Sequence, residues 1–446
     1  MEMRGHDRLG FSLAEYRRRY DAVMQHVRGL GVDGLLVRSP ENICYLTGYE
    51  TPGYYKYHGL ILSADEPVLV LRRLEEPNAW EFSWLARTAP IEDHEHPVEV
   101  TARVLERLGL ADKRLGVEKA GWYFSVEEYE GLRAALPRAS LVDATGAVWK
   151  ARVVKSAEEI AVMRRPARIA DWRRRPASTR SPWAARRTRW PPRSTGWRSS
   201  TGASTWGCSP FVLSGERTCL PHGTWRGRRI QTGDHVYFEV SAAKFRYSVA
   251  LMRCVSLGEP SPRVRALADA VIGGREAGMA AVEPGVSCEA VDAACRGVIE
   301  RAGPGKCFTQ RTGYSIGVNF PPDWGEGEIL SLRRGEPIPL ELNMTFHMVP
   351  LCLIYRELGV GFSATVRVTE TGCEELTSLP RTLVVKSSRR RSKPCTGGGR
   401  SSASSIWRPA RPSSTSTIGW RRPAWCRSPP DSSSPAARPP RPRRSP

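Results

Sequence analysis

Two neighbouring runs of alternating apolar residues, 236–240 and 247–255, constrain the fold of this chain more than any other feature. Alternation with a period of two predicts β-strands, and two such runs separated by a few residues predict a strand pair. Glu239 lies within the first run, and His222 precedes it in a Pro-His-Gly stretch that predicts a loop. The pattern therefore allows a carboxylate and a histidine to meet beside paired strands.

The net charge of +21 is not spread evenly along the chain, because the excess of Lys and Arg over Asp and Glu is concentrated in two tracts. Residues 172–207 hold nine arginines and no acid, and residues 387–446 hold fourteen Lys or Arg with one Asp. These tracts account for the basic excess, so the remaining chain is close to neutral and no nucleic-acid partner is expected. Both tracts lose apolar periodicity and fill with Arg, Ser and Pro, a composition that predicts disorder. An Arg/Trp segment that binds single-stranded nucleic acid is the alternative, and a shifted reading frame explains the abrupt edges of the tracts better.

The rest of the composition is typical of a large soluble protein. A chain of 446 residues with 40% hydrophobic content is long enough for more than one core. No apolar run approaches the ~20 residues of a membrane span, and the N-terminus does not resemble a secretory signal. Eleven cysteines occur without a C-x-x-C pair, which favours reduced thiols. We expect a cytoplasmic protein with no membrane partner.

The apolar pattern divides the ordered part of the chain into two domains. Short strand-like runs alternate with helical ones over residues 1–150, which predicts an α/β domain. Residues 151–386 carry longer strands, a helix near 263–280 and a further expected strand at 338–342, and they contain the anomalous tract 172–207. The tail from 387 onwards lies outside both domains.

Several motifs resemble the creatinase and Xaa-Pro dipeptidase superfamily, known for its pita-bread fold. They are the HG…R…GD-x-V-x-x-[DE] pattern at 222–239, TGYSIG at 312–317, NMTFHM at 343–348 and ENICYLTGYETPGYYKY at 41–57. Within the superfamily the chain is most similar to the ectoine hydrolase branch. The resemblance implies an α/β N-terminal domain, an α+β pita-bread C-terminal domain and a homodimer.

Metallopeptidases of this superfamily have a metal site, but this chain has other residues at the positions of the metal ligands. Metallopeptidases of this superfamily bind two metal ions with two aspartates, a histidine and two glutamates. By motif alignment these five positions hold Glu239, Ala250, Tyr314, Val349 and Ala364. One acid among five positions cannot hold a metal pair, so we expect no metal and no other cofactor.

The expected reaction follows from the metal-free members of the superfamily. Creatine and ectoine present a cationic, electrophilic carbon, which a dication beside it would repel. We therefore expect a small-molecule substrate and the opening of a cyclic amidine by hydrolysis of a non-peptide C–N bond. The resemblance implies catalytic roles for Glu239 and His222 and substrate binding by Tyr314, His347, Tyr247 and Trp324.

Alternatives remain open at the level of the sequence. Glu239 shares a strand face with Tyr237 and Ser241, so it points either into a cleft or to solvent. A creatinase-like amidinohydrolase or an Xaa-Pro peptidase-like protein is the alternative enzyme. An inactive pita-bread binding protein, or the product of a damaged gene, is the alternative outside the enzymes.

Overall fold

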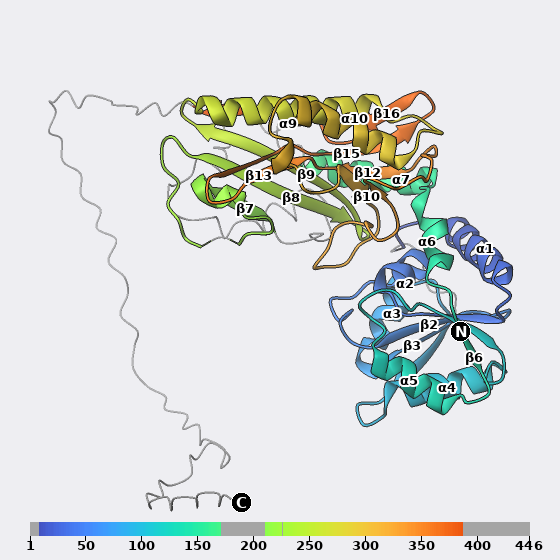
Figure 1. Cartoon of the computed structure of the whole chain (residues 1–446). Coiled ribbons are helices and arrows are strands. Elements are labelled where there is room, and N and C mark those ends of the chain that lie inside the picture. The colour runs from blue at the N-terminus through green and yellow to red at the C-terminus, as the bar shows by residue number, and fades with distance from the viewer. Residues whose placement is uncertain (1–8, 171–209, 225, 387–446) are drawn as a thin grey trace, which may run out of the picture. The chain divides into compact units, whose positions relative to one another are not determined.

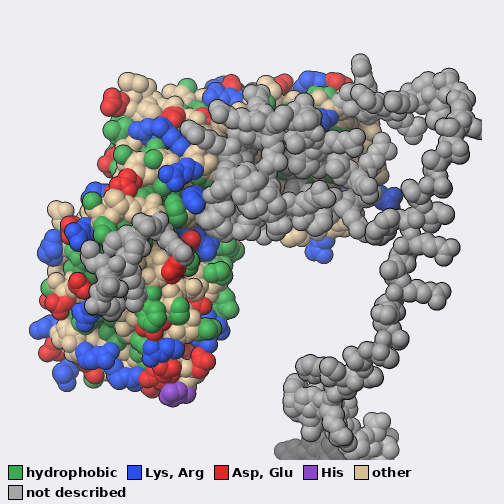
Figure 2. All heavy atoms as spheres, turned by 180° about the vertical axis from the view of Figure 1, so that it is seen from behind, with side chains coloured by type: hydrophobic (Ala, Val, Ile, Leu, Met, Phe, Trp, Pro, Cys, Tyr) green, Lys and Arg blue, Asp and Glu red, His purple; other side chains and the backbone are tan. Residues whose placement is uncertain are grey.

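The computed structural model describes residues 9–170, 210–224 and 226–386 (Figure 1). The expectations for 172–207 and 387–446 lie outside these residues. Within them, no helix is long and apolar enough to cross a membrane. Figure 2 shows basic and acidic side chains interspersed over the described surface of one face.

The first half of the chain forms a six-stranded mixed sheet with helices on its faces, as the alternating pattern predicted. The strand order is β4-β3-β2-β1-β5-β6, with β1/β2 and β2/β3 antiparallel and the other pairs parallel. The strands are β1 (Gly34–Val37), β2 (His58–Leu62), β3 (Val68–Arg72), β4 (Arg87–Ile91), β5 (Arg114–Val117) and β6 (Ser140–Asp143). The helices are α1 (Leu13–Gly29), α2 (Pro40–Thr47), α3 (Glu76–Phe82), α4 (Pro97–Arg107), α5 (Val126–Ala135) and α6 (Gly146–Val153).

Both faces of this sheet are buried, which explains why its strands read as continuous apolar runs. One core contains Leu105 and Leu132 from α4 and α5. The other contains Val23 and Val27 from α1 and continues into residues of the second half such as Tyr247. Helix α1 begins where Ser12 caps it, because the Ser12 hydroxyl accepts a hydrogen bond from the backbone N–H of Glu15.

The second half is dominated by antiparallel strands in three sheets. Their orders are β17-β9-β8-β7, β11-β10-β12-β15-β16 and β13-β14. The strands are β7 (Phe211–Ser214), β8 (His235–Lys244), β9 (Tyr247–Leu257), β10 (Gly313–Ser315), β11 (Ser331–Leu332), β12 (Thr345–Met348), β13 (Leu351–Ile354), β14 (Leu358–Gly361), β15 (Ala364–Thr369), β16 (Gly372–Glu375) and β17 (Val384–Lys386). The paired strands β8 and β9 are the two alternating runs of the sequence.

Three helices pack on these strands: α7 (Ala157–Ala170), α9 (Pro262–Ala280) and α10 (Cys288–Arg301). Figure 1 shows α9 and α10 side by side along one face of the strands, and α7 contacts β8 and β9. Helix α10 begins after Ser287, whose hydroxyl accepts a hydrogen bond from the backbone N–H of Ala290. The core under α9 and α10 includes Tyr237 and Met252, which come from β8 and β9.

The turn between β8 and β9 uses residues that a sequence pattern would not select. Phe245 and Arg246 both have positive φ, at 49° and 64°, a conformation usually taken by Asn-Gly in two-residue hairpins. Arg246 is held there by an ion pair of 3.0 Å with Glu50 and by the ring of Phe320, 4.2 Å from its guanidinium. Tertiary contacts therefore offset the local backbone cost.

One predicted strand is wrong. Residues 338–342 form a loop with a single bridge between Pro339 and Ser287, and the chain enters the next strand only at Thr345. The apolar residues Ile338 and Leu342 are exposed there. A proline in the middle of the run cannot donate a ladder hydrogen bond, which is the physical reason for the loop.

Candidate active site

Glu239 points into the protein rather than to solvent. On β8 its neighbour Tyr237 lies in the core beneath α9 and α10, while Val236 and Phe238 form a separate small cluster on the opposite face. Glu239 is only 5% exposed, and no other described residue forms a hydrogen bond or ion pair with its carboxyl group. Burial, with a smaller contribution from the negative charge of Asp323, raises the pKa of Glu239 to about 8. A buried carboxyl without a partner is costly, and such groups concentrate at functional sites.

Tyr314 and His347 lie opposite each other on β10 and β12 and share a hydrogen-bond network. The Tyr314 hydroxyl lies 2.9 Å from His347 Nδ1 and accepts a bond of 2.7 Å from the indole N–H of Trp324. His347 Nε2 lies 2.7 Å from the Ser363 hydroxyl. Burial, together with the nearby arginines Arg253 and Arg311, lowers the pKa of His347 to about 3. His347 is therefore neutral, with one ring nitrogen donating and the other accepting.

Phe211 links these residues to Glu239 and His222. It is paired with Glu239 across the β7–β8 ladder. Its ring centroid lies 5.4 Å from that of His222 and 5.4 Å from that of Trp324. His222 is exposed and has a φ of 52°, so its backbone is held in the left-handed region.

We call this group the Glu239 cluster: Glu239, Phe211, His222, Tyr314, Trp324 and His347. The structure thus brings together five of the six residues predicted for the site. Burial of each phenol, followed by the negative charge of Glu239, raises the pKa values of Tyr237 and Tyr314, so Glu239 is an electrostatic neighbour of both. The cluster offers one carboxyl, two imidazoles, a phenol and an indole N–H, a set suited to proton transfer and to hydrogen bonding of a small ligand.

Tyr247, the sixth predicted residue, lies in a different cluster. Its hydroxyl donates a hydrogen bond of 2.7 Å to Glu159, and its ring lies 5.1 Å from that of Phe11. The guanidinium of Arg19 lies 5.8 Å from the same ring. These contacts assign Tyr247 to the packing of α1 and α7 against β9.

We expect Tyr247→Phe to lower the free energy of unfolding by about 1–3 kcal/mol, because Glu159 loses a buried hydrogen bond. Its kcat and KM should equal those of the wild type. Chemical denaturation measures the first effect and steady-state kinetics the second. A tenfold higher KM in a stably folded variant would show that Tyr247 binds substrate after all.

The residues at the family's metal positions do not fit a metal pair. Among the described residues, no group of three or more His, Cys, Asp or Glu is placed to hold a metal ion. Ala250 faces the same side of the hairpin as Glu239, Tyr314 takes the histidine position, and Val349 is an apolar core residue. These side chains offer no carboxylate or imidazole, so hard divalent ions would lack the oxygen ligands they need.

The position of the second glutamate requires a correction. We assigned it to Ala364, but Ala364 packs in a core with Phe346 and Met348, facing away from His347. The preceding residue, Ser363, bonds His347 and accepts from the backbone N–H of Met252 at 2.6 Å. Ser363 is therefore the residue that points toward the Glu239 cluster, and the correction leaves the number of acids unchanged.

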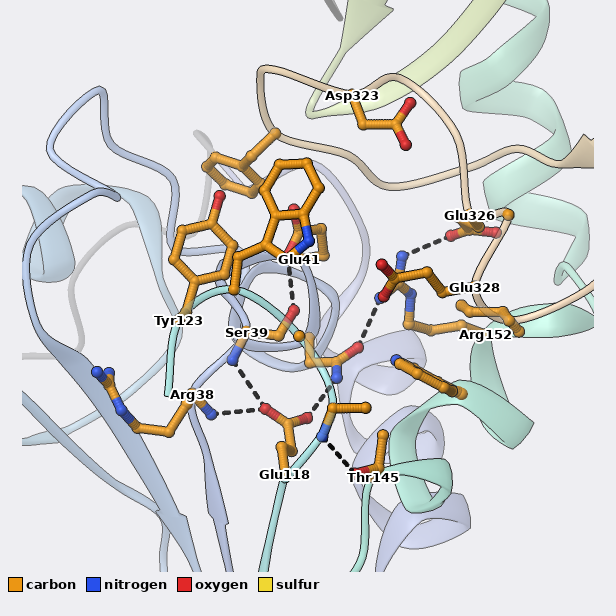
Figure 3. Close-up of a pocket in the computed structure, with 18 of the residues that line it drawn as sticks. Arg38, Ser39, Glu41, Glu118, Tyr123, Thr145, Arg152, Asp323, Glu326 and Glu328 are labelled. Atoms are coloured by element: carbon orange, nitrogen blue, oxygen red, sulfur yellow. Dashed lines mark hydrogen bonds and ion pairs between the residues drawn. The ribbon is translucent and has the colours of Figure 1, made fainter. Parts of the chain in front are cut away.

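A pocket of about 100 Å³ lies beside the loop that carries Trp324 (Figure 3). Its walls come from the loops after β1 and β5, from α6 and from residues 320–329. Asp323 lines this pocket, and its negative charge also acts on Glu239. We call it the Asp323 pocket.

Three residues of this region were missed at the level of the sequence. Asp323 stands next to Trp324 in a loop that we singled out only for its tryptophan. Phe211 and Ser363 carry no sequence signal, because a lone aromatic or serine at a strand end is too common to predict a role. Only the pairing of β7 with β8, and the path of the chain into β15, place them.

The fold and these motifs define a class of protein. The chain belongs to the metallopeptidase family M24, which its residues 194–370 match, and residues 19–154 match the creatinase/prolidase N-terminal domain. The predicted superfamily and the predicted fold class, an α/β domain followed by an α+β pita-bread domain, are thereby confirmed.

Its relatives include both hydrolases and peptidases. An uncharacterised hydrolase/peptidase of Sinorhizobium fredii is 34% identical over 389 residues, which are 84% of this chain and 97% of that protein. The ectoine hydrolase of Halomonas elongata is 30% identical over 397 residues, 85% of this chain and 99% of that protein. Among solved structures, the dipeptidase PepE of Mycobacterium ulcerans matches with a TM-score of 0.70 and 26% identity, covering 84% of this chain and 99% of its own. A hydrolase of the M24 family is the activity that these relatives share.

Proposed function

We propose that this protein is a metal-independent hydrolase that opens a cyclic amidine similar to ectoine by breaking a non-peptide C–N bond. One observation carries the proposal: among the described residues the buried carboxyl of Glu239 has no hydrogen-bond or ion-pair partner, while the other family metal positions have no acid or imidazole. The similarity to ectoine hydrolase supports the choice of substrate.

The electrostatics of Glu239 favour a cationic substrate. Burial disfavours its ionised form, and a cation placed beside it restores that form by direct attraction. A protonated cyclic amidine is planar and cationic and can pair with a carboxylate through two N–H groups. Substrate binding would therefore create the charged Glu239 that the reaction needs.

The reaction adds one water to the amidine carbon and breaks one C–N bond of the ring. Glu239 either takes a proton from the attacking water or attacks the carbon itself, with water then releasing it. The ring nitrogen that leaves takes up a proton, which we propose comes from His222; the exposure of His222 and its ring contact with Phe211 support this role. The products on either route are an amide and a free amine.

The Tyr314 network would hold the substrate's polar groups. When His347 carries its proton on Nδ1, the Tyr314 hydroxyl accepts from both His347 and Trp324 and keeps its own proton for the ligand. Trp324 adds an indole face, on which a planar cation can stack.

The proposal predicts that the purified protein hydrolyses ectoine and holds no stoichiometric transition metal. Product formation, followed by NMR, should proceed equally before and after treatment with a chelator, and added Mn²⁺ or Co²⁺ should not raise it. Xaa-Pro dipeptides and creatine should remain intact under the same conditions.

Two results would reject this function. Two equivalents of Mn, Co or Zn per chain by elemental analysis, with chelator-sensitive cleavage of Xaa-Pro dipeptides, would make the protein a metallopeptidase. A folded protein that turns over none of these compounds would support a binding protein or a damaged gene product.

We also propose that the protein acts as a homodimer in the cytoplasm. The homodimer comes from the resemblance to creatinase. The cytoplasm is supported by the eight described cysteines, which are all free thiols. Light scattering coupled to gel filtration measures the mass in solution and so tests the homodimer.

A further inference from the structure

Asp323 is held in a fixed orientation in the loop that carries Trp324. One of its carboxylate oxygens, Oδ1, accepts hydrogen bonds from the backbone N–H groups of Trp324, at 2.6 Å, and Gly325, at 3.0 Å. The backbone carbonyl of Asp323 accepts a hydrogen bond of 2.5 Å from the side-chain amide of Asn319. These bonds set the orientation of the carboxylate before any ligand binds, and Oδ2 has no bond to another described residue.

The carboxylate of Asp323 faces two places at once. It lines the Asp323 pocket, where Figure 3 shows it without a bond to another drawn residue. The next residue, Trp324, lies 5.4 Å ring to ring from Phe211, which is paired with Glu239 across the β7–β8 ladder, and the charge of Asp323 also raises the pKa of Glu239. Asp323 therefore stands between the pocket and the Glu239 cluster.

The Asp323 pocket has an excess of negative charge. Five acids and two arginines line it. The two arginines are already committed: Arg152 binds Glu326 and Asn42, and Arg38 binds Glu128 and the carbonyl of His58. An anion entering the pocket would find no free cation on these walls, whereas a cation would find the carboxylates of Asp323 and Glu328.

Aromatic side chains also line the Asp323 pocket. They are Trp122, Tyr123, Phe124, Trp149 and Phe320. Aromatic faces attract cations through their quadrupole, so rings combined with carboxylates suit a small planar cation.

Arg311 feels the charge of Asp323, and the described residues show no ion pair between the two. Its guanidinium carbon lies 4.5 Å from the centre of the Tyr314 ring, and its Nη1 donates a hydrogen bond to the Ser331 hydroxyl. The charge of Asp323 opposes ionisation of Glu239, and a ligand cation bound beside them would offset this effect.

We propose that Asp323 is the specificity-determining residue of this enzyme: it draws a small planar organic cation, an amidinium or a guanidinium, from the Asp323 pocket to Glu239 and excludes neutral analogues of the same shape. This inference rests on the proposed function but extends it, because it assigns the choice of a charged substrate to one residue. Asp323 binds substrate, and Glu239 performs the chemistry.

The test replaces the charge of Asp323 and keeps its shape. The variant Asp323→Asn retains an oxygen that can accept the two backbone N–H groups, so the loop keeps its bonds. Asp65→Asn, on an exposed turn of the N-terminal domain, is the matched control for the loss of one negative charge. We expect Asp323→Asn to raise KM for ectoine about 10- to 100-fold, the usual worth of a hydrogen bond to a charged group, and to change kcat less than threefold. Asp65→Asn should change neither.

A direct binding experiment separates this inference from the proposed reaction. Calorimetry with acetamidinium chloride, and with acetamide as its neutral analogue, needs no turnover. The wild-type protein should bind acetamidinium at least tenfold more tightly than acetamide, and Asp323→Asn should lose this preference. Absence of ectoine turnover with the preference intact would reject the reaction and keep the role of Asp323. Equal binding of both probes by the wild type, or an unchanged preference in Asp323→Asn, would overturn the inference.

Discussion

Glu239→Gln should abolish hydrolysis of the amidine, with kcat/KM falling by about 10³-fold or more, within the range known for the loss of a general base or nucleophile. The amide has the size of the carboxyl group but cannot take a proton from water, attack carbon or carry the charge that pairs with an amidinium. Steady-state kinetics against the wild type measure the loss. Glu66→Gln, on an exposed turn, is the control and should keep full activity. Wild-type turnover by a folded Glu239→Gln protein would remove Glu239 from the mechanism.

The same variant should be more stable than the wild type in alkaline solution. The pKa of Glu239 is about 8 in the folded protein and 4.5 for an ordinary glutamate, so between these values the folded state holds a proton that the unfolded state has released. Wild-type stability therefore falls as the pH rises through this window, whereas the neutral Gln variant does not titrate. The difference in unfolding free energy should grow to a few kcal/mol, at ~1.4 kcal/mol per pKa unit. Thermal denaturation at pH 5 and pH 9 measures it, and equal differences at both would show that Glu239 ionises freely in the fold.

If Glu239→Gln gains stability while it loses activity, this combination would be a physical sign that Glu239 belongs to a functional site. A core position selected only for folding would hold an apolar residue or a paired acid, since a buried carboxyl without a partner opposes folding. Glu239 has neither property, and its retention on β8 requires a reason outside stability. The reaction proposed here supplies that reason.

The sequence predicts the strands of this fold well where one physical rule acts alone. The alternation through Val236 and Phe238 identifies β8, and the serine caps at Ser12 and Ser287 mark the starts of α1 and α10. It fails where a second rule opposes the first. Apolar residues around Pro339 match a strand pattern but form a loop, because the proline cannot donate a ladder hydrogen bond.

The candidate site was predictable in its residue types and not in its arrangement. Motif resemblance selects Glu239 and Tyr314, but the period of a strand allows Glu239 to face either side. Only the packing of Tyr237 beneath α9 decides that it faces inward. The resemblance implied that Tyr247 binds substrate, but its hydroxyl donates a hydrogen bond to Glu159 on α7, far away in sequence. The position of Asp323 in the site depends on the conformation of its loop, which the composition of the sequence does not reveal.

The loop that carries Asp323 and Trp324 is anchored by Glu326, a buried acid between two cations. Glu326 accepts hydrogen bonds of 2.7 Å from both Arg152 and Lys155, and one of 3.0 Å from the Ser315 hydroxyl. All three charged side chains are at most 4% exposed. Despite its burial, the two cations hold the pKa of Glu326 below its usual value. Because Arg152 and Lys155 follow the first sheet and Glu326 belongs to the second half of the chain, the network joins the two halves.

Glu326→Gln should lower the free energy of unfolding by about 3–5 kcal/mol, since the amide leaves two buried cations without a counter-charge. Urea denaturation at pH 7 measures the loss. Glu374→Gln removes a partly exposed acid that pairs with Arg164 and Arg367 near the surface, and this control should cost less than about 1 kcal/mol. The sign of the pH dependence follows from the lowered pKa: the stabilisation by Glu326 is complete above the ordinary value of 4.5 and is lost as the pH falls through its folded value. The gap between wild type and Glu326→Gln should therefore narrow in acid, and a gap that stays constant below pH 4.5 would show that the loop is anchored by packing rather than by charge.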